Sequence, residues 1–245
     1  MSRYFLILIF CLVLTLPLEF AFRAKVYRRP FLALKAISIP SLIYLIWDII
    51  ATHFDHWAFV QQHSSSFNVF GLPIEEYLFF LFIPICCLLT FESVKNLHPR
   101  SISSIAKPTL WVLFIFSYLT SGLAIFSFRL NSYDLEVPHR IFPYYFVATL
   151  CALTLLILAF FRSEKLKSLV TSQAYFYTIF ICMFFMVFVN GALTILDDPV
   201  VTYKANLGPR LFFDIPIEDF IYGTVLLTWI LLRWIKYTRN EIEAK

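Results

Sequence analysis

The sequence predicts an all-α integral membrane protein with about seven transmembrane helices. Of its 245 residues, 60% are hydrophobic and 15% are charged, whereas a soluble domain is about half apolar and a quarter charged. Most of the apolar stretches approach the ~20 residues that a helix needs to cross the hydrocarbon core. The first is interpreted as a retained span, because positive charge follows its long apolar run. The expected spans cover residues 4–22, 31–50, 74–90, 110–128, 142–161, 174–196 and 215–234.

Two short acidic motifs are nearly identical. One reads Pro73-Ile74-Glu75-Glu76 and the other Pro216-Ile217-Glu218-Asp219, and each leads into an aromatic and aliphatic run. The two prolines are 143 positions apart, as are the acidic pairs. An acid embedded in a membrane suggests function, because its desolvation must be compensated. The recurrence therefore indicates a duplicated site.

A second pair of polar residues extends the duplication. Asp48 precedes Glu75 by 27 residues, and Asn190 precedes Glu218 by 28. The order of spans and connections also matches between the halves. The sequence thus predicts two parallel three-helix repeats that enclose a cavity. The first repeat is expected at 1–108, a connecting span at 109–129, and the second repeat at 130–245.

Basic residues predict the orientation in the membrane. The first, third and fifth connections and the C-terminal segment hold 15 Lys and Arg residues, against 5 in the N-terminal segment and the even connections. The positive-inside rule then places the N-terminus outside and the C-terminus in the cytoplasm of a multi-pass protein in the cell membrane. Both acidic motifs consequently fall at the outer ends of their helices.

The acidic pairs are the candidate catalytic residues. A proline and acids are favourable in a first helical turn, so helix capping at the water interface is the alternative reading. Recurrence in a duplicated unit favours chemistry, because a desolvated carboxylic acid can donate a proton and a hydrogen-bonded carboxylate can accept one. Adjacent helical residues point about 100° apart, so at most one acid of each pair faces a given cavity. The candidates are Glu75, Glu76, Glu218 and Asp219.

Residues near the acids are candidates for binding a substrate. Aromatic rings attract positive charge in a dry site, although most aromatic residues here fit lipid-facing positions or interfacial belts. Asp48 and Asn190 are candidates for the cavity, with hydrogen bonding between helices as the alternative. His53, His56 and His63 lack a supporting ligand set, so no metal is expected. The binding candidates are Asp48, Asn190, Tyr77, Phe79, Phe80, Phe220 and Tyr222.

These motifs resemble the lycopene cyclase domain family, in its fused form. In the first half the likeness rests on Trp47-Asp48-Ile49-Ile50-Ala51-Thr52, His56-Trp57 and the first acidic motif, and in the second on Asn190-Gly191-Ala192-Leu193-Thr194, Gly208-Pro209-Arg210 and the second motif. The resemblance implies a membrane enzyme of carotenoid biosynthesis that isomerises the open ends of lycopene to β-rings, giving γ- and β-carotene.

The resemblance also implies a mechanism. An acid protonates the terminal double bond, the cation closes the ring, and a base removes a proton. Glu75 or Glu76 and Glu218 or Asp219 would supply acid and base, with the assignment between the halves open. No flavin fingerprint is present, so no cofactor is expected. The partner would be lycopene or a related carotenoid within the bilayer, with no nucleic acid, and a homo-oligomer is left open.

Other functions remain open at this stage. Parallel repeats and membrane acids also fit a small transporter or proton-coupled carrier, and a structural assembly or receptor protein would not need duplicated acids. A related cyclase that makes another ring type shares the same motifs. The acids lie at the outer ends of almost uniformly apolar spans, and this distribution favours a lipid-soluble substrate.

Overall fold

The chain is mainly helical in a computed structural model that describes residues 1–97, 144–194, 198–203, 210 and 215–243. The expected span 110–128 and the boundaries of the connecting span lie outside the described residues. The helices are α1 (Arg3–Thr15), α2 (Pro17–Ala21), α3 (Pro30–His53), α4 (Ile74–Leu97), α6 (Tyr144–Arg162), α7 (Glu164–Val170), α8 (Gln173–Thr194) and α9 (Ile217–Glu243). The strands are β1 (Trp57–Phe59), β2 (Asn68–Val69), β3 (Leu72–Pro73) and β4 (Val201–Tyr203).

Five helical segments in the described part of the chain are long and apolar enough to cross a membrane. They are Arg3–Ala21, Pro30–His53, Ile74–Leu97, Tyr145–Arg162 and Gln173–Thr194. The segment α9 is also long, but acids open it and basic residues follow from Arg233 onward, so it does not meet the same criterion. The expected count of seven spans is therefore not established by the described helices.

The helices begin and end where their local sequence favours it. Ser2 caps α1, since its hydroxyl accepts a hydrogen bond from the Phe5 amide, and prolines open α2 and α3. Pro73 and Pro216 lie one residue before α4 and α9. The expectation that they occupy the first helical turn was off by this one residue: Pro73 ends β3, and Pro216 forms a bridge with Arg210.

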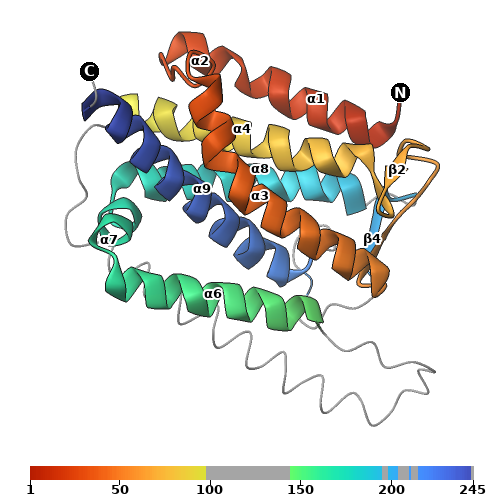
Figure 1. Cartoon of the computed structure of the whole chain (residues 1–245). Helices are drawn as coiled ribbons and strands as arrows, with labels where there is room; N and C mark the ends of the chain where they lie inside the picture. Colours follow the sequence, from red (N-terminus) through yellow and green to blue (C-terminus); the bar gives the residue numbers. More distant parts are fainter. Residues whose placement is uncertain (98–143, 195–197, 204–209, 211–214, 244–245) are drawn as a thin grey trace.

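Long helices pack against one another both within each half of the chain and between the halves (Figure 1). In the first half α1 packs on α4, and in the second α6 packs on α9. Between the halves, α3 packs on α9 and α8 packs on α4. Each contact therefore has a counterpart in which the halves are exchanged.

The short strands also form one pairing between the halves and one pairing within each half. Strand β1 from the first half pairs antiparallel with β4 from the second, so that Ala58 lies opposite Thr202. Asn68 pairs with Pro73 in the first half, and Arg210 pairs with Pro216 in the second. The strands lie near the N-terminal end of α1, away from α2 and the C-terminus (Figure 1).

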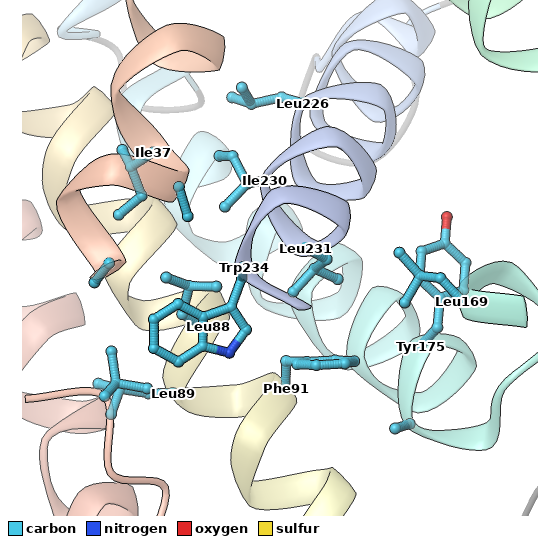
Figure 2. Close-up of a cluster of buried hydrophobic side chains, with 14 of the residues drawn as sticks. Ile37, Leu88, Leu89, Phe91, Leu169, Tyr175, Leu226, Ile230, Leu231 and Trp234 are labelled. Atoms are coloured by element: carbon cyan, nitrogen blue, oxygen red, sulfur yellow. The ribbon is translucent and has the colours of Figure 1, made fainter. Parts of the chain in front are cut away.

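A buried core joins the halves midway along α4 and α9 (Figure 2). Leu88, Leu89 and Phe91 of α4 gather with Ile230, Leu231 and Trp234 of α9. Trp234 is 1% exposed. Close van der Waals packing of such large side chains holds helices together, so this cluster fixes the relative position of the two helices that carry the acidic motifs.

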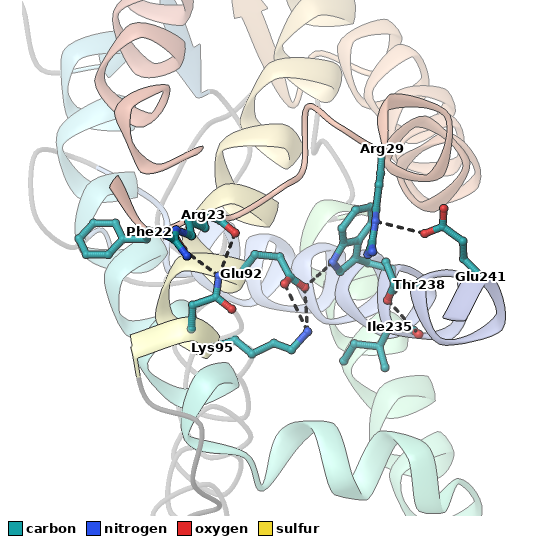
Figure 3. Close-up of polar contacts among 10 residues, drawn as sticks. Phe22, Arg23, Arg29, Glu92, Lys95, Ile235, Thr238 and Glu241 are labelled. Atoms are coloured by element: carbon teal, nitrogen blue, oxygen red, sulfur yellow. Dashed lines mark hydrogen bonds and ion pairs between the residues drawn. The ribbon is translucent and has the colours of Figure 1, made fainter. Parts of the chain in front are cut away.

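Polar contacts tie the opposite end of the molecule together (Figure 3). Glu92 accepts a hydrogen bond from the Trp234 indole at 2.8 Å and pairs with Lys95 at 3.1 Å. Arg29 pairs with Glu241 at 3.1 Å. Glu92 and Glu241 thus have cationic partners at this end.

Candidate active site

The two acidic motifs open α4 and α9 and point their side chains into the protein. All four carboxyl groups are buried: Glu75 and Glu218 are 1% exposed, Glu76 8% and Asp219 6%. Each pair lies in the first turn of its helix, where the helix dipole favours negative charge. Their burial is far deeper than capping at a water interface requires.

The four acids differ in whether they line a large cavity. This cavity has a volume of about 1400 Å³ and runs between α1, α4 and α8, with α9 beside it. Glu76 and Asp219 line this cavity, as do Asp48 and Asn190. Glu75 and Glu218 do not line it in the described part of the chain. One acid of each pair therefore faces the cavity, and the wall around these polar groups is mainly apolar.

Glu76 belongs to a carboxyl pair in the first half. Its Oε2 accepts a hydrogen bond from the Tyr4 hydroxyl at 2.5 Å, and its carboxyl group also contacts that of Asp48 as a hydrogen-bonding partner. Asp48 Oδ1 accepts from the Trp57 indole at 2.6 Å. Its Oδ2 is buried and has no N–H or O–H donor among the described residues. Because ionised carboxylates only accept, a hydrogen bond between Asp48 and Glu76 requires a proton on one of them.

Asp219 has a different environment in the second half. Its Oδ1 accepts from the Tyr145 hydroxyl at 2.5 Å, and its Oδ2 accepts from the Tyr203 hydroxyl at 2.6 Å and the Asn190 amide at 2.9 Å. Burial, followed by the nearby Asp219 charge, raises the pKa of Tyr203 well above its ordinary value. Tyr203 therefore keeps its proton and acts as a donor, so that Asp219 is surrounded by three donors suited to a carboxylate.

Glu75 ties α4 to the loop before it and to the N-terminal segment. Its Oε1 accepts hydrogen bonds from the Ser2 hydroxyl and, at 2.8 Å, from the Ser65 amide. Glu218 occupies the equivalent place on α9 and is equally buried. These contacts position Glu75 as an anchor for the chain outside the cavity.

The expected aromatic residues divide into two groups. Phe79, Phe80 and Tyr222 line the cavity. Tyr77 and Phe220, both partly buried, are not among its wall residues in the part of the chain that the structure describes. The Tyr77 hydroxyl instead donates to the Val69 carbonyl at 2.8 Å, which fastens the loop to α4.

Four aromatic residues at the site were not predicted from the sequence. Tyr4 and Tyr145 bind the two acids, Tyr203 adds a donor, and Trp57 orients Asp48. Tyr4 and Tyr145 are 141 positions apart near the starts of equivalent helices, so the repeat spacing was a usable signal. Tyr203 had no such signal, because its place depends on the pairing of β1 with β4.

The aromatic rings form a continuous cluster between the two acids. Trp57 lies 5.0 Å from Tyr145 and 6.1 Å from Tyr203, and Tyr145 lies 5.8 Å from Tyr222, measured between ring centroids. Tyr222 is within electrostatic range of Asp48, Glu76 and Asp219. Such rings can stabilise positive charge in a dry site.

The arrangement offers proton transfer to an apolar molecule. Within the described residues, no Lys or Arg forms an ion pair with Asp48, Glu76 or Asp219. The site combines two neighbouring carboxyl groups, Asp48 and Glu76, a third carboxyl group at Asp219 and an aromatic wall, all facing one cavity. These groups can donate a proton, stabilise a cation and accept a proton.

Comparison with known proteins agrees with this chemistry. The family model described as lycopene cyclase matches residues 2–94 and 142–233, which together make up more than half of the chain. No curated protein and no solved structure matches it. The two matched segments contain both acidic motifs and every cavity-facing acid described above. The chain therefore belongs to the lycopene cyclase family.

Proposed function

We propose that this protein is a lycopene β-cyclase that isomerises the open ends of lycopene to β-rings within a lipid bilayer. The observation that carries the proposal is the pair of cavity-facing acids, Glu76 and Asp219, on either side of an aromatic cluster. Family membership supports a carotenoid cyclase in general. The β-ring, the membrane location and the residue roles are our inferences.

The surface supports a location in the bilayer. Large apolar side chains are exposed along the helices: Phe10 is 65% exposed, Phe31 84% and Phe180 64%. Soluble monomers rarely expose extended apolar patches, whereas lipid solvates them. We infer a multi-pass protein with its N-terminus outside and its C-terminus, at the basic end, in the cytoplasm.

The cavity supports a long apolar substrate. Its wall follows α4 from Glu76 to Leu97, a length of roughly 30 Å at about 1.5 Å per helical residue. The wall side chains along this length include Ile83, Cys87 and Val94. A polyene would lie along this wall with its end among the acids, in a site with few polar groups to hold a hydrophilic solute.

The reaction needs only proton transfers. A carboxylic acid adds a proton to the terminal double bond and leaves a tertiary cation. The electrons of the next double bond along the chain attack this cation, which closes a six-membered ring and moves the positive charge to a ring carbon. Loss of the neighbouring ring proton to a carboxylate forms the ring double bond. One proton enters and one leaves, so the formula and oxidation state are unchanged, and the proposed mechanism uses no cofactor.

The matched contacts of the two halves support an internal duplication. We infer two parallel three-helix repeats, at 1–108 and 130–245, joined by a connecting span at 109–129. The β1–β4 pair joins one strand from each half, and each long-helix contact described above has a counterpart with the halves exchanged, as this organisation requires. It would place one acid from each repeat on either side of a shared site.

Pigment analysis in a bacterium that accumulates lycopene tests the proposal. We expect the protein to convert lycopene to γ- or β-carotene, identified by chromatography and absorption spectra. Glu76→Gln and Asp219→Asn should abolish this conversion while still inserting. Glu19→Gln is the matched control, because the buried Glu19 accepts from the Val26 amide at 2.8 Å and a glutamine oxygen can do the same.

Each other outcome of this experiment has a defined meaning. Unchanged lycopene despite confirmed membrane insertion of the parent would contradict the cyclase proposal and favour a proton-coupled carrier. Rings with the double bond elsewhere would keep the cyclase and reject the β-specificity. Full conversion by both acid variants would reject the proposed roles of Glu76 and Asp219.

A further inference from the structure

We propose that the two halves have separate roles, with the Asp48–Glu76 pair as the acid and Asp219 as the base. The division is set by one difference between the repeats, an aspartate at position 48 and an asparagine at position 190. This inference rests on the proposed cyclase function and deepens it. Its basis is the set of partners around each cavity-facing acid.

Asp48 and Asn190 hold equivalent places. Asp48 lies near the end of α3 and Asn190 near the end of α8, and each contacts the acid that opens the following long helix. Both face the cavity. The two acids thus differ in whether this neighbour is a second carboxyl group or an amide, and Asp219 has the Tyr203 hydroxyl as an additional donor.

In the first half, the neighbouring Asp48 makes Glu76 part of a pair that can donate a proton. A hydrogen bond between the Asp48 and Glu76 carboxyl groups requires a shared proton, since neither carboxylate can donate. The Trp57 indole and the Tyr4 hydroxyl each donate to one of the two acids. These donors stabilise one negative charge on the pair and leave one proton that faces the cavity.

In the second half, the neighbouring Asn190 makes Asp219 a proton acceptor. The Asn190 amide donates to Asp219 Oδ2 at 2.9 Å, and two tyrosine hydroxyls donate to the same carboxylate. All three partners favour the ionised form. Asn190, Tyr145 and Tyr203 are therefore positioning residues that keep Asp219 available as a base.

The charges balance through the reaction. The acid pair passes its proton to the terminal double bond and gains a second negative charge beside the new cation. After ring closure, Asp219 takes the ring proton and becomes neutral. Before the next turnover, Asp219 must lose a proton and the acid pair must regain one, so the net charge of the site is restored.

Two isosteric substitutions test the division directly. In Asp48→Asn the carboxamide oxygen can still accept from Trp57, and the new amide donates to Glu76, so no shared proton is needed. We expect ring formation to fall by roughly 100-fold or more, with unchanged ring type in the residual product. Asn190→Asp places a second carboxyl beside Asp219, and we expect slower ring formation with part of the product carrying its ring double bond elsewhere.

Infrared spectroscopy provides a readout that does not depend on activity. The purified parent protein should show the C=O stretch of a protonated carboxyl group that shifts in D2O. This band should be missing from Asp48→Asn and retained in Asp219→Asn. A parent without the band, or an Asp48→Asn variant that keeps it, would overturn the assignment of the acid.

The activity results separate this inference from the proposed function. If the parent forms no rings, the cyclase proposal fails whatever the infrared result. If the parent is active and Asp48→Asn retains at least a third of its rate, only the division of roles fails. A changed ring type in Asp48→Asn, with an unchanged one in Asn190→Asp, would reverse the assignment and overturn the proposal.

Discussion

Acids lie at both ends of this molecule, and their burial and their partners differ. At the basic end Glu92 pairs with Lys95 and the Trp234 indole, and Glu241 pairs with Arg29 (Figure 3). At the cavity end Glu76 and Asp219 are held by tyrosine hydroxyls, with Asp48 and Asn190 beside them.

This contrast separates structural acids from candidate catalytic ones. A cation fixes the charge of its partner, so the partly exposed Glu92 and Glu241 hold helices together without exchanging protons. Neutral donors orient a carboxyl group and leave it able to titrate within a dry site. Burial alone does not identify the functional acids in this fold, because Glu19 is also buried and accepts from the Val26 amide, and it is not among the cavity-wall residues in the described part of the chain. The candidate acids are those that both line the cavity and accept from neutral side-chain donors.

The largest expected effect comes from removing the cavity-facing base. Asp219→Asn keeps the size of the side chain but cannot accept the ring proton, so ring formation should fall by roughly 10²–10⁴-fold. Initial rates with lycopene in detergent or vesicles measure this loss. A rate within threefold of the parent in a folded variant would place the base elsewhere.

The next effect tests the space beside the acids. The glycine at position 223 lines the cavity, and an added Cβ would lie 3.4 Å from the flexible Met183 and Met186 side chains. Gly223→Ala should be tolerated, whereas Gly223→Leu overpacks the site at about 1–3 kcal/mol. If the substrate occupies this space, the same cost of about 1–3 kcal/mol opposes its binding, so we expect turnover by Gly223→Leu to be roughly tenfold slower at low lycopene concentration. Equal rates for both variants would show that the substrate does not pass this position.

An effect of comparable size is expected from removing a single donor to Asp219. Tyr203→Phe removes a hydroxyl that donates at 2.6 Å, and a hydrogen bond to a charged group contributes about 1.5–3 kcal/mol. Ring formation should fall by at least about tenfold, with a shift in ring type because the base is less well oriented. Tyr77→Phe is the matched control, since Tyr77 donates to a backbone carbonyl away from the cavity wall. Equal losses in both variants would indicate a general structural effect.

The smallest effect on catalysis is expected at the basic end. Glu92→Gln keeps an acceptor for the Trp234 indole but removes the charge next to Lys95. The activity per folded molecule should stay within about twofold, while the free energy of unfolding falls by about 1 kcal/mol or less, as for other exposed pairs. Thermal unfolding in detergent measures the second quantity. A large loss of turnover in a stable Glu92→Gln variant would remove the distinction between the two ends.

The sequence was sufficient to identify the four acids and their repeat, because Pro-Ile-acid-acid recurs at a fixed spacing. The helical angle also indicated that at most one acid of each pair faces a given cavity. The sequence could not assign Glu76 and Asp219 to that cavity, since the rotation of α4 and α9 depends on packing around Trp234. The partners Tyr4 and Tyr203 come from tertiary contacts that no local pattern determines.

The most direct test of the acid–base account is cyclisation of lycopene by the purified protein in D2O. The product is analysed by mass spectrometry. The account predicts one solvent deuterium for each ring formed, because the proton that starts the reaction comes from a carboxyl group that exchanges with water. Rings that form at the normal rate without deuterium would contradict it.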